Sequence, residues 1–176
     1  MAFSDPQQNL ESLGIQEGSY VADLGSGSGF YSFAAARLVG GGGKVYSIDV
    51  QQDLLSRIKN AAHVQKLHNI EVIHGDIERL GGTRLREASI DIVLLCNVLF
   101  QVEHKQDCVN EVKRILKPGG RVLIVDWQDS FGGMGPAPEH VFTELQVQEL
   151  YEKSSFVFIS SIDAGDHHYG VVYRKG

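Results

Sequence analysis

The residue pattern most indicative of chemistry is a glycine-rich loop between an apolar run and a helical pattern. Residues 21–32 read VADLGSGSGFYS, an apolar stretch that ends at the acid Asp23, three alternating glycines and the start of a helix. Glycines at such a junction let a ligand approach the backbone at the N-terminus of the helix. A second acid, Asp49, ends the next apolar run about 20 residues after the last glycine, where a carboxylate can accept both hydroxyls of a ribose. The spacing predicts a site for a nucleotide-type ligand.

The details of this loop distinguish between classes of ligand. A dinucleotide-binding loop has the spacing G-x-G-x-x-G, whereas this chain has D-x-G-x-G-x-G. A carboxylate at Asp23 would repel a pyrophosphate and would suit a cationic amino group, contacted directly or through water. Together with Asp49, it calls for a ribose and an amino acid without phosphates, a description that S-adenosylmethionine meets. An NAD(P)-dependent oxidoreductase is the disfavoured alternative.

Polar residues recur where the predicted strands end. They are Asp23, Asp49, Asp76, Asn97 and Asp126. Strand ends are common places for polar turn residues, so none of them indicates a site by itself. Five in succession after a glycine loop favour one shared site, because doubly wound sheets bind ligands beyond the carboxyl ends of their strands.

The alternation of strand and helix patterns predicts an α/β fold. Strand patterns cover residues 20–24, 44–48, 70–74, 90–96, 121–127, 156–162 and 169–174. Helical patterns cover residues 5–14, 30–38, 54–62, 104–116 and 143–153, with a weakly patterned helix around 79–87. The expected fold is a Rossmann-like, doubly wound, seven-stranded sheet, mostly parallel with a C-terminal antiparallel hairpin. We expect a single domain over residues 1–176, in which residues 1–19 form an N-terminal helical extension.

Composition narrows the class of protein. The chain has 176 residues, of which 43% are hydrophobic and 22% charged, as in ordinary globular proteins. It has no apolar run of about 18 residues, and its N-terminus has neither the basic nor the apolar region of a signal peptide. The two cysteines, Cys96 and Cys108, lie in a strand pattern and a helix pattern, which favours reduced thiols. We therefore expect a cytoplasmic protein that does not bind membranes.

The charge distribution argues against nucleic acid as a partner. The net charge is −6, and from Asp126 onward eight acidic residues face three basic ones. Binding to phosphate backbones requires clustered lysine and arginine, which this third of the chain lacks.

The ordered set of motifs resembles the class I S-adenosylmethionine-dependent methyltransferases, over nearly the whole chain. The matching segments are VADLGSGSG at 21–29, IDV at 48–50, HGDIERL at 74–80, CNVLFQV at 96–102 and LKPGGRVLIVDW at 116–127. By motif, the chain looks like the small-molecule branch that includes ubiquinone/menaquinone C-methyltransferases. The resemblance implies that Asp76 and Ile77 meet the adenine and that Asn97 lies at the methionine end. The cofactor-binding residues expected on this basis are Asp23, Gly25, Ser26, Gly27, Gly29, Asp49, Val50, Asp76, Ile77 and Asn97.

Several departures from that branch concern the acceptor. Only about 20 residues precede the first strand, whereas relatives often carry a longer helical region that caps the substrate. Phe100-Gln101 stands where a histidine pair is frequent. Two cysteines placed as here do not support the similar arsenite methyltransferases, and the pattern builds no evident long apolar channel for a quinone.

Methyl transfer from a sulfonium is an in-line displacement, and holding the nucleophile near the methyl carbon provides much of the catalysis. A general base is needed only if the acceptor loses a proton. The candidates are Asp126, His140 and His168, although His140 and the adjacent pair His167-His168 also fit plain surface positions. The pattern predicts no metal site.

A Gly- and Pro-rich segment, residues 131–140, follows the fifth strand and could act as a lid over a small-molecule acceptor. Trp127 and Phe131 could form an aromatic wall there or simply pack in the core, and Phe3 could fold over the cofactor. The alternative function is a non-catalytic S-adenosylmethionine-binding module or partner subunit, which the short N-terminus favours slightly. We expect a monomer or homodimer.

Overall fold

Seven strands form one sheet in the computed structural model, which describes residues 4–176. The strands are β1 (Tyr20–Leu24), β2 (Lys44–Asp49), β3 (Ile70–His74), β4 (Ile90–Cys96), β5 (Leu116–Trp127), β6 (Phe156–Ile162) and β7 (His168–Lys175). Their order is β3-β2-β1-β4-β5-β7-β6. The first five strands are parallel, and β7 is antiparallel to both of its neighbours. The predicted α/β class and antiparallel C-terminal hairpin are confirmed, and the hairpin is arranged so that its second strand joins β5.

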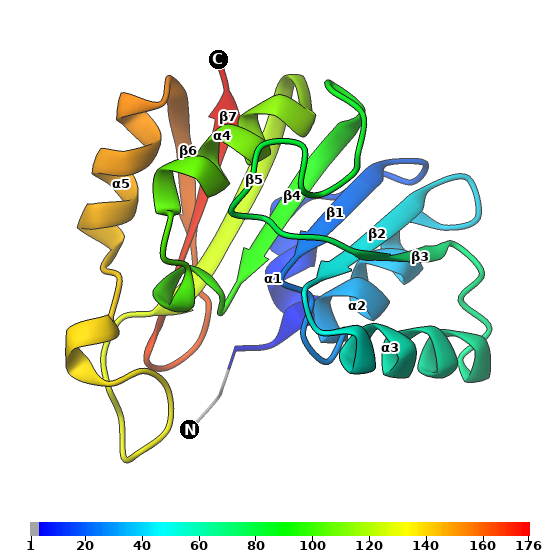
Figure 1. Ribbon diagram of the computed structural model, residues 1–176, viewed down its shortest axis with the longest axis horizontal. Coiled ribbons are helices and arrows are strands. Elements are labelled where there is room, and N and C mark those ends of the chain that lie inside the picture. The colour runs from blue at the N-terminus through cyan, green and yellow to red at the C-terminus, as the bar shows by residue number, and fades with distance from the viewer. Residues whose placement is uncertain (1–3) are drawn as a thin grey trace.

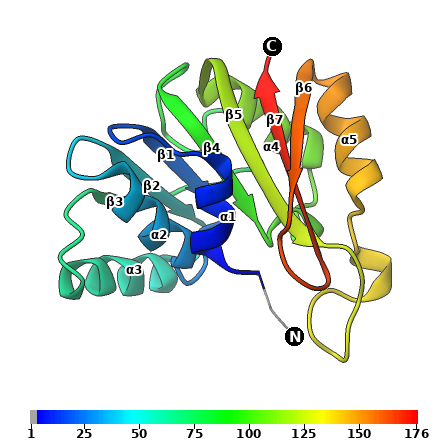
Figure 2. The same cartoon turned by 180° about the vertical axis from the view of Figure 1, so that it is seen from behind.

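Helices cover both faces of this sheet. They are α1 (Pro6–Leu13), α2 (Phe30–Val39), α3 (Gln52–Val64), α4 (Lys105–Ile115) and α5 (Glu144–Lys153). In Figure 1 α4 and α5 lie on the near face, and Figure 2 shows α1, α2 and α3 on the other. Each layer buries its own apolar cluster, one with Val112 and Tyr151 and the other with Leu10 and Ala35. Strands covered on both sides explain the continuous apolar run in β4.

Local signals placed several elements correctly. The Asp5 side chain accepts hydrogen bonds from two backbone amides at the start of α1, and α1 ends at Gly14 with φ 64°. Thr143 and Gln146 form a capping box at the start of α5. Gly40 ends α2 with a positive φ of 63°, and residues 40–43 form the turn that leads into β2.

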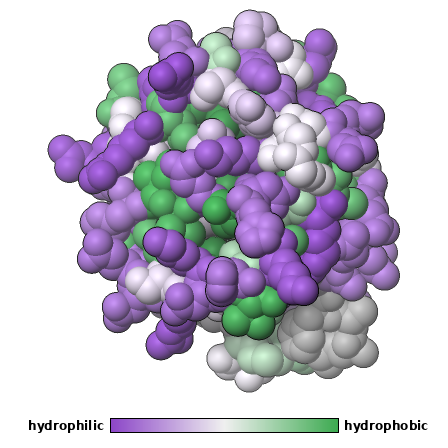
Figure 3. Space-filling model, turned by 90° about the vertical axis from the view of Figure 1, so that its right-hand side faces the viewer, coloured by the Kyte–Doolittle hydropathy of each residue, from purple (hydrophilic) through white to green (hydrophobic). Residues whose placement is uncertain are grey.

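The weakly patterned stretch around residues 79–87 is not a helix, which corrects the prediction. The chain between β3 and β4 consists of turns, with left-handed backbone at Gly81 (φ 78°) and Arg84 (φ 61°). These conformations are incompatible with a continuous right-handed helix. In Figure 1 this loop crosses the near face of the sheet. Figure 3, which faces the β3 edge, shows apolar atoms between hydrophilic side chains on that side.

The strand predicted over residues 121–127 begins earlier than expected, at Leu116. After α4 ends at Ile115, the chain enters β5 at once, and Leu116 already pairs with Ile90. The register between the two strands shifts before Arg121 pairs with Ile92. The Pro-Gly-Gly segment is therefore an irregularity within a long strand and not a separate turn.

The strand order reverses between β1 and β4, where the chain crosses from one half of the sheet to the other. The carboxyl ends of β1, β2, β4 and β5 meet at this edge, where doubly wound folds bind ligands. No helix among residues 4–176 is long and apolar enough to cross a membrane. Both cysteines are free, with Cys108 buried and Cys96 partly buried. Phe3 lies outside the described residues.

Candidate cofactor and active site

A cavity of about 550 Å³ lies at the carboxyl ends of the central strands. Its lining includes all ten residues that the sequence predicts for the cofactor: Asp23, Gly25, Ser26, Gly27, Gly29, Asp49, Val50, Asp76, Ile77 and Asn97. These residues come from four segments separated by up to 74 positions, and the fold brings them to one place. The size lies within the range of small-molecule sites in proteins.

The glycine loop follows β1 and leads into α2. The amides of Gly25 and Ser26 donate to the carbonyl of Ile48, at 2.8 and 3.0 Å, which fixes the loop against β2. Gly25 has φ 71°, and a Cβ atom there would collide with the side chain of Val98. Gly27, by contrast, has only one atom within 4 Å of a Cβ position, so its open side leaves room for a ligand. The first glycine is thus needed for packing and the second borders the cavity.

Asp49 ends β2 with its carboxylate held in place by backbone amides. One oxygen accepts a hydrogen bond from Gly27 at 3.0 Å and the other accepts one from Gln51 at 2.9 Å. The side chain belongs to the cavity lining although the residue is only 7% exposed. Each carboxylate oxygen has a second lone pair, so a rigid carboxylate of this kind can accept two hydroxyl groups from a ligand.

Asp23 is almost completely buried at the end of β1. Its carboxylate accepts a hydrogen bond of 2.6 Å from Ser32, whose hydroxyl lies 2.6 Å from that of Ser47. Burial raises the pKa of Asp23 to about 6, the Ser32 hydrogen bond acts in the opposite direction, and the charge of Asp49 raises it further. At neutral pH this is a buried anion with no cationic partner among residues 4–176, facing a cavity. A ligand ammonium would compensate that charge.

A pH dependence of ligand binding follows from Asp23. Because an ammonium binds the ionised carboxylate, affinity for S-adenosylhomocysteine should fall as pH decreases through about 6, by up to about tenfold per pH unit below it. The pKa of Asp23 in the folded protein lies above its unfolded value of 3.8. Ionisation of Asp23 therefore lowers the stability of the ligand-free protein as pH rises from the unfolded pKa to the folded pKa of about 6. Calorimetry from roughly one pH unit below this pKa to roughly two units above it measures the first effect. The variant Asp23→Asn should give weak, nearly pH-independent binding, and an unchanged pH profile in that variant would contradict the assignment.

The opposite sides of the cavity differ in character. At one side, the Asp76 carboxylate accepts a hydrogen bond of 2.9 Å from the amide of Glu78, next to the buried side chain of Ile77. At the other side, Asn97 adopts the left-handed conformation (φ 56°), and its Oδ1 is buried without a partner among the described residues. The hydroxyl of Ser26 is likewise buried and unpartnered. Buried polar atoms without partners are uncommon, and two of them among the residues that line one cavity fit a polar ligand.

The three general-base candidates do not line the cavity as described. The Asp126 carboxylate is fully buried and accepts hydrogen bonds from the amides of Trp127 (2.8 Å) and Phe100 (3.2 Å), and burial raises its pKa to about 6. His140 is exposed in a short 3-10 turn. His168 is buried against the Trp127 ring at 4.3 Å, and burial lowers its pKa.

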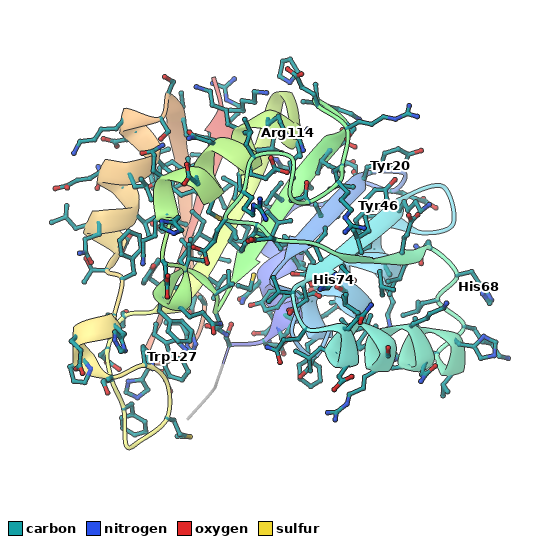
Figure 4. All side chains as sticks on the ribbon, in the orientation of Figure 1. Tyr20, Tyr46, His68, His74, Arg114 and Trp127 are labelled. Carbon is teal, nitrogen blue, oxygen red and sulfur yellow. The ribbon has the colours of Figure 1, made fainter. Side chains whose placement is uncertain are left out.

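The loop after β5 is folded back onto the start of β7. The Phe131 ring stacks on His167 at 4.0 Å, and the His167 ring lies 2.8 Å from the carboxylate of Asp129. Gly135 packs against the indole of Trp127, which Figure 4 shows where β5 meets this loop. The aromatic residues singled out in the sequence therefore hold the loop together.

Sequence reasoning missed several residues of the cavity wall. Tyr31, from the first turn of α2, lines the cavity, and its hydroxyl accepts a hydrogen bond of 2.7 Å from Asn9 and lies 3.0 Å from Ser4. Glu78 and Gln101 also contribute to the lining. The isolated side chains carry no spacing signal, although each lies within four residues of a predicted site residue or glycine.

No group of three or more His, Cys, Asp or Glu side chains in residues 4–176 is arranged to hold a metal ion.

The comparison with known families agrees with this geometry. A family model described as a methyltransferase domain matches residues 15–166, which is most of the chain. The chain therefore belongs to the class I S-adenosylmethionine-dependent methyltransferases. A solved structure of a S-adenosylmethionine-dependent methyltransferase from Aquifex aeolicus is similar to it, with a TM-score of 0.90 and 28% identity, covering 99% of this chain and 91% of that one.

The curated relatives include proteins that are named for different reactions. An arsenite methyltransferase of Halobacterium salinarum is 34% identical over 109 residues, which cover 62% of this chain and 27% of the relative. A ubiquinone/menaquinone biosynthesis C-methyltransferase of Pseudomonas fluorescens is 27% identical over 152 residues, covering 85% of this chain and 53% of the relative. The chain spans at most about half the length of these two relatives.

Proposed function

We propose that this chain is a methyltransferase that transfers a methyl group from S-adenosylmethionine to a small-molecule acceptor. The observation that carries the proposal is the cavity at the strand ends, which combines a buried anion at Asp23 with a fixed carboxylate at Asp49. These groups match an ammonium and a ribose, and the carboxylate of Asp23 would repel a pyrophosphate. Family membership and the Aquifex structure support the same cofactor.

Each end of the cofactor has a matching wall in this cavity. The carboxylate of Asp49 would accept the ribose hydroxyls, and Asp76 with the apolar side chain of Ile77 would contact the adenine. The unpartnered Oδ1 of Asn97 would accept a hydrogen bond from the amino group at the methionine end, near Asp23. Gly25, Ser26, Gly27, Gly29 and Val50 complete this proposed site.

Catalysis by this chain would consist mainly of positioning. S-adenosylmethionine, when bound, supplies an electrophilic methyl group on a sulfonium, which an acceptor nucleophile attacks in line with the departing sulfur. The anchors at Asp23 and Asp49 would hold the cofactor and so fix the direction of its methyl group. The acceptor would lie at the Asn97 side, under the 129–140 loop. Asp126, His140 and His168 remain candidates for a base only if that loop rearranges when an acceptor binds.

The cysteines argue against arsenite as the acceptor. Cys96 lines the cavity, but Cys108 is fully buried in α4, so the structure presents one thiol to the cavity from these two residues. Burial raises the pKa of Cys96 well above its ordinary value, and the negative charge of Asp23 raises it further. Arsenic binding requires thiolates, which this environment opposes. We therefore favour an organic acceptor.

Transfer of a labelled methyl group tests the proposal. The chain is incubated with methyl-labelled S-adenosylmethionine and a panel of phenols, quinols, amines, carboxylic acids and arsenite. We expect labelled product and one S-adenosylhomocysteine per methyl group transferred for at least one organic class. Tight S-adenosylhomocysteine binding without transfer to any compound would favour the alternative, a non-catalytic binding module or partner subunit. The absence of binding would overturn both readings.

The sequence predictions of a cytoplasmic location and of a monomer or homodimer are kept as proposals. Sedimentation and cell fractionation would test them.

A further inference from the structure

Glu111 is a buried charged residue outside the cavity that the proposed mechanism does not use. It lies in the middle of α4, and its side chain is completely inaccessible to solvent. A buried carboxylate is costly unless several donors satisfy it. Its presence therefore calls for an explanation from its partners.

The donors to Glu111 come from two different segments. Arg114, one turn along α4, donates from Nε and Nη2, each at 2.8 Å, to the two carboxylate oxygens. The other donors lie in the loop before β4: the amide of Gly81 at 2.7 Å, the amide of Thr83 at 3.2 Å and the Thr83 hydroxyl at 2.5 Å. Burial alone raises the pKa of Glu111, but these hydrogen bonds outweigh it and hold the pKa below its ordinary value. The carboxylate is thus ionised and saturated.

Arg114 extends the same connection. Its Nη2 also donates to the carbonyl of Leu85 at 2.9 Å. Figure 4 shows Arg114 at the end of α4 next to the loop that leads into β4. Glu111 and Arg114 therefore hold the loop between β3 and β4, which contains no helix.

The turn formed by residues 81–83 is in direct backbone contact with the cavity wall. The carbonyl of Gly82, between the two anchored residues, accepts a hydrogen bond of 3.1 Å from the amide of Asp76. A side chain at position 82 would collide with the Asp76 carbonyl, so the two backbones are closely packed. The Asp76 carboxylate in turn accepts from the amide of Glu78, another lining residue. A continuous path leads from α4 to the side of the cavity that would hold the adenine.

We infer that Glu111 is a positioning residue for the adenine side of the cofactor site, acting through the Gly81–Thr83 turn on Asp76. The inference rests on the proposed function. Gly81, Thr83 and Arg114, which donate hydrogen bonds to Glu111, do not belong to the cavity lining. No helix lies between β3 and β4 to support this wall of the cavity, and Glu111 provides that support instead.

A double-mutant cycle in S-adenosylhomocysteine affinity tests the inference. Glu111→Gln replaces one acceptor oxygen with an amide group that cannot accept, and should weaken binding by about tenfold. In the double variant of Glu111→Gln with Asp76→Ala, affinity should fall by much less than the product of the two single losses, because both changes act on one wall. In the double variant of Glu111→Gln with Asn97→Ala, at the other side of the cavity, the loss of affinity should equal the product of the two single losses. Glu149→Gln, the same change at an exposed position of α5, should leave affinity unchanged.

A second pair of variants covers the case in which Glu111→Gln does not fold. Thr83→Val removes one of the hydrogen bonds and should weaken S-adenosylhomocysteine binding severalfold, whereas Thr83→Ser keeps the hydroxyl and should restore it. Amide hydrogen exchange should show faster exchange at Gly81 and Thr83 in Glu111→Gln or Thr83→Val, with the central strands unchanged.

The outcomes separate the inference from the proposed function. The inference would be overturned, and the proposed function left standing, by equal affinity in wild type, Glu111→Gln and Thr83→Val. The same would follow if the double variant with Asp76→Ala lost affinity by the full product of the two single losses. A wild-type chain that does not bind S-adenosylhomocysteine would overturn the function and this inference with it.

Discussion

Replacing Asp49 by alanine is expected to weaken S-adenosylhomocysteine binding by well over tenfold. The variant loses the acceptor for two ribose hydroxyls, and hydrogen bonds to a charged group contribute about 1.5–3 kcal/mol each. It also frees the amide of Gly27, which Asp49 holds at 3.0 Å in the glycine loop. Both effects act in the same direction, so this is the largest loss of affinity that we expect from one side chain.

Calorimetry with purified variants measures this effect. Asp53→Ala is the matched control, because Asp53 is an exposed acid in the first turn of α3 and does not belong to the cavity lining. Asp49→Asn, which keeps one acceptor oxygen, should fall between alanine and wild type. Unaltered binding by Asp49→Ala would refute the assignment of the ribose site.

Replacing Gly25 by alanine should destabilise the protein most among the glycine variants of the loop. The φ of 71° places an L-residue in the left-handed region, at a cost of about 1–2 kcal/mol. The new methyl group would also collide with Val98, and overpacking of this kind typically costs about 1–3 kcal/mol more. We expect a loss of roughly 2–5 kcal/mol in the free energy of unfolding, together with weaker S-adenosylhomocysteine binding.

Gly14 provides the control for the backbone cost alone. It has a similar φ of 64°, but nothing lies within 4 Å of a Cβ atom built there. Gly14→Ala should therefore lose only the strain of about 1–2 kcal/mol, as measured by urea unfolding. Equal losses at positions 14 and 25 would mean that the contact with Val98 does not matter.

The ten residues that the sequence predicts for the cofactor line one cavity because the signals that mark them are local. Each predicted residue stands at the end of an apolar strand pattern or within the glycine loop, and the doubly wound topology then brings these ends together. Asp23 and Asp49 are examples: their positions follow from strand length, and their proximity follows from the parallel pairing of β1 with β2.

The remaining features depend on contacts between distant residues, which periodicity does not report. Glu111 and Thr83 lie 28 residues apart, and only the structure shows that one holds the other. The weak helical pattern near residue 79 led to a wrong prediction. Periodicity does not report the left-handed backbone at Gly81 and Arg84, on which the turn there depends. The hydrogen bond between Tyr31 and Asn9, which joins α2 to α1, is another contact that periodicity does not report.

The acceptor side shows where residue types mislead. His168 and Trp127 looked available for chemistry, but they pack on each other where β7 meets β5. Asp126 is held by backbone amides of the turn after β4, which carries Asn97 and Gln101 to the cavity. Its buried carboxylate supports that turn in the described structure.

The central claim is that the cavity at the strand ends binds S-adenosylmethionine through Asp23 and Asp49. A crystal structure of the protein with S-adenosylhomocysteine tests it most directly. We predict both ribose hydroxyls within hydrogen-bonding distance of the Asp49 carboxylate, the ammonium beside Asp23 and the adenine against Asp76 and Ile77. A ligand bound elsewhere, or bound in the cavity with its ribose away from Asp49, would contradict the account.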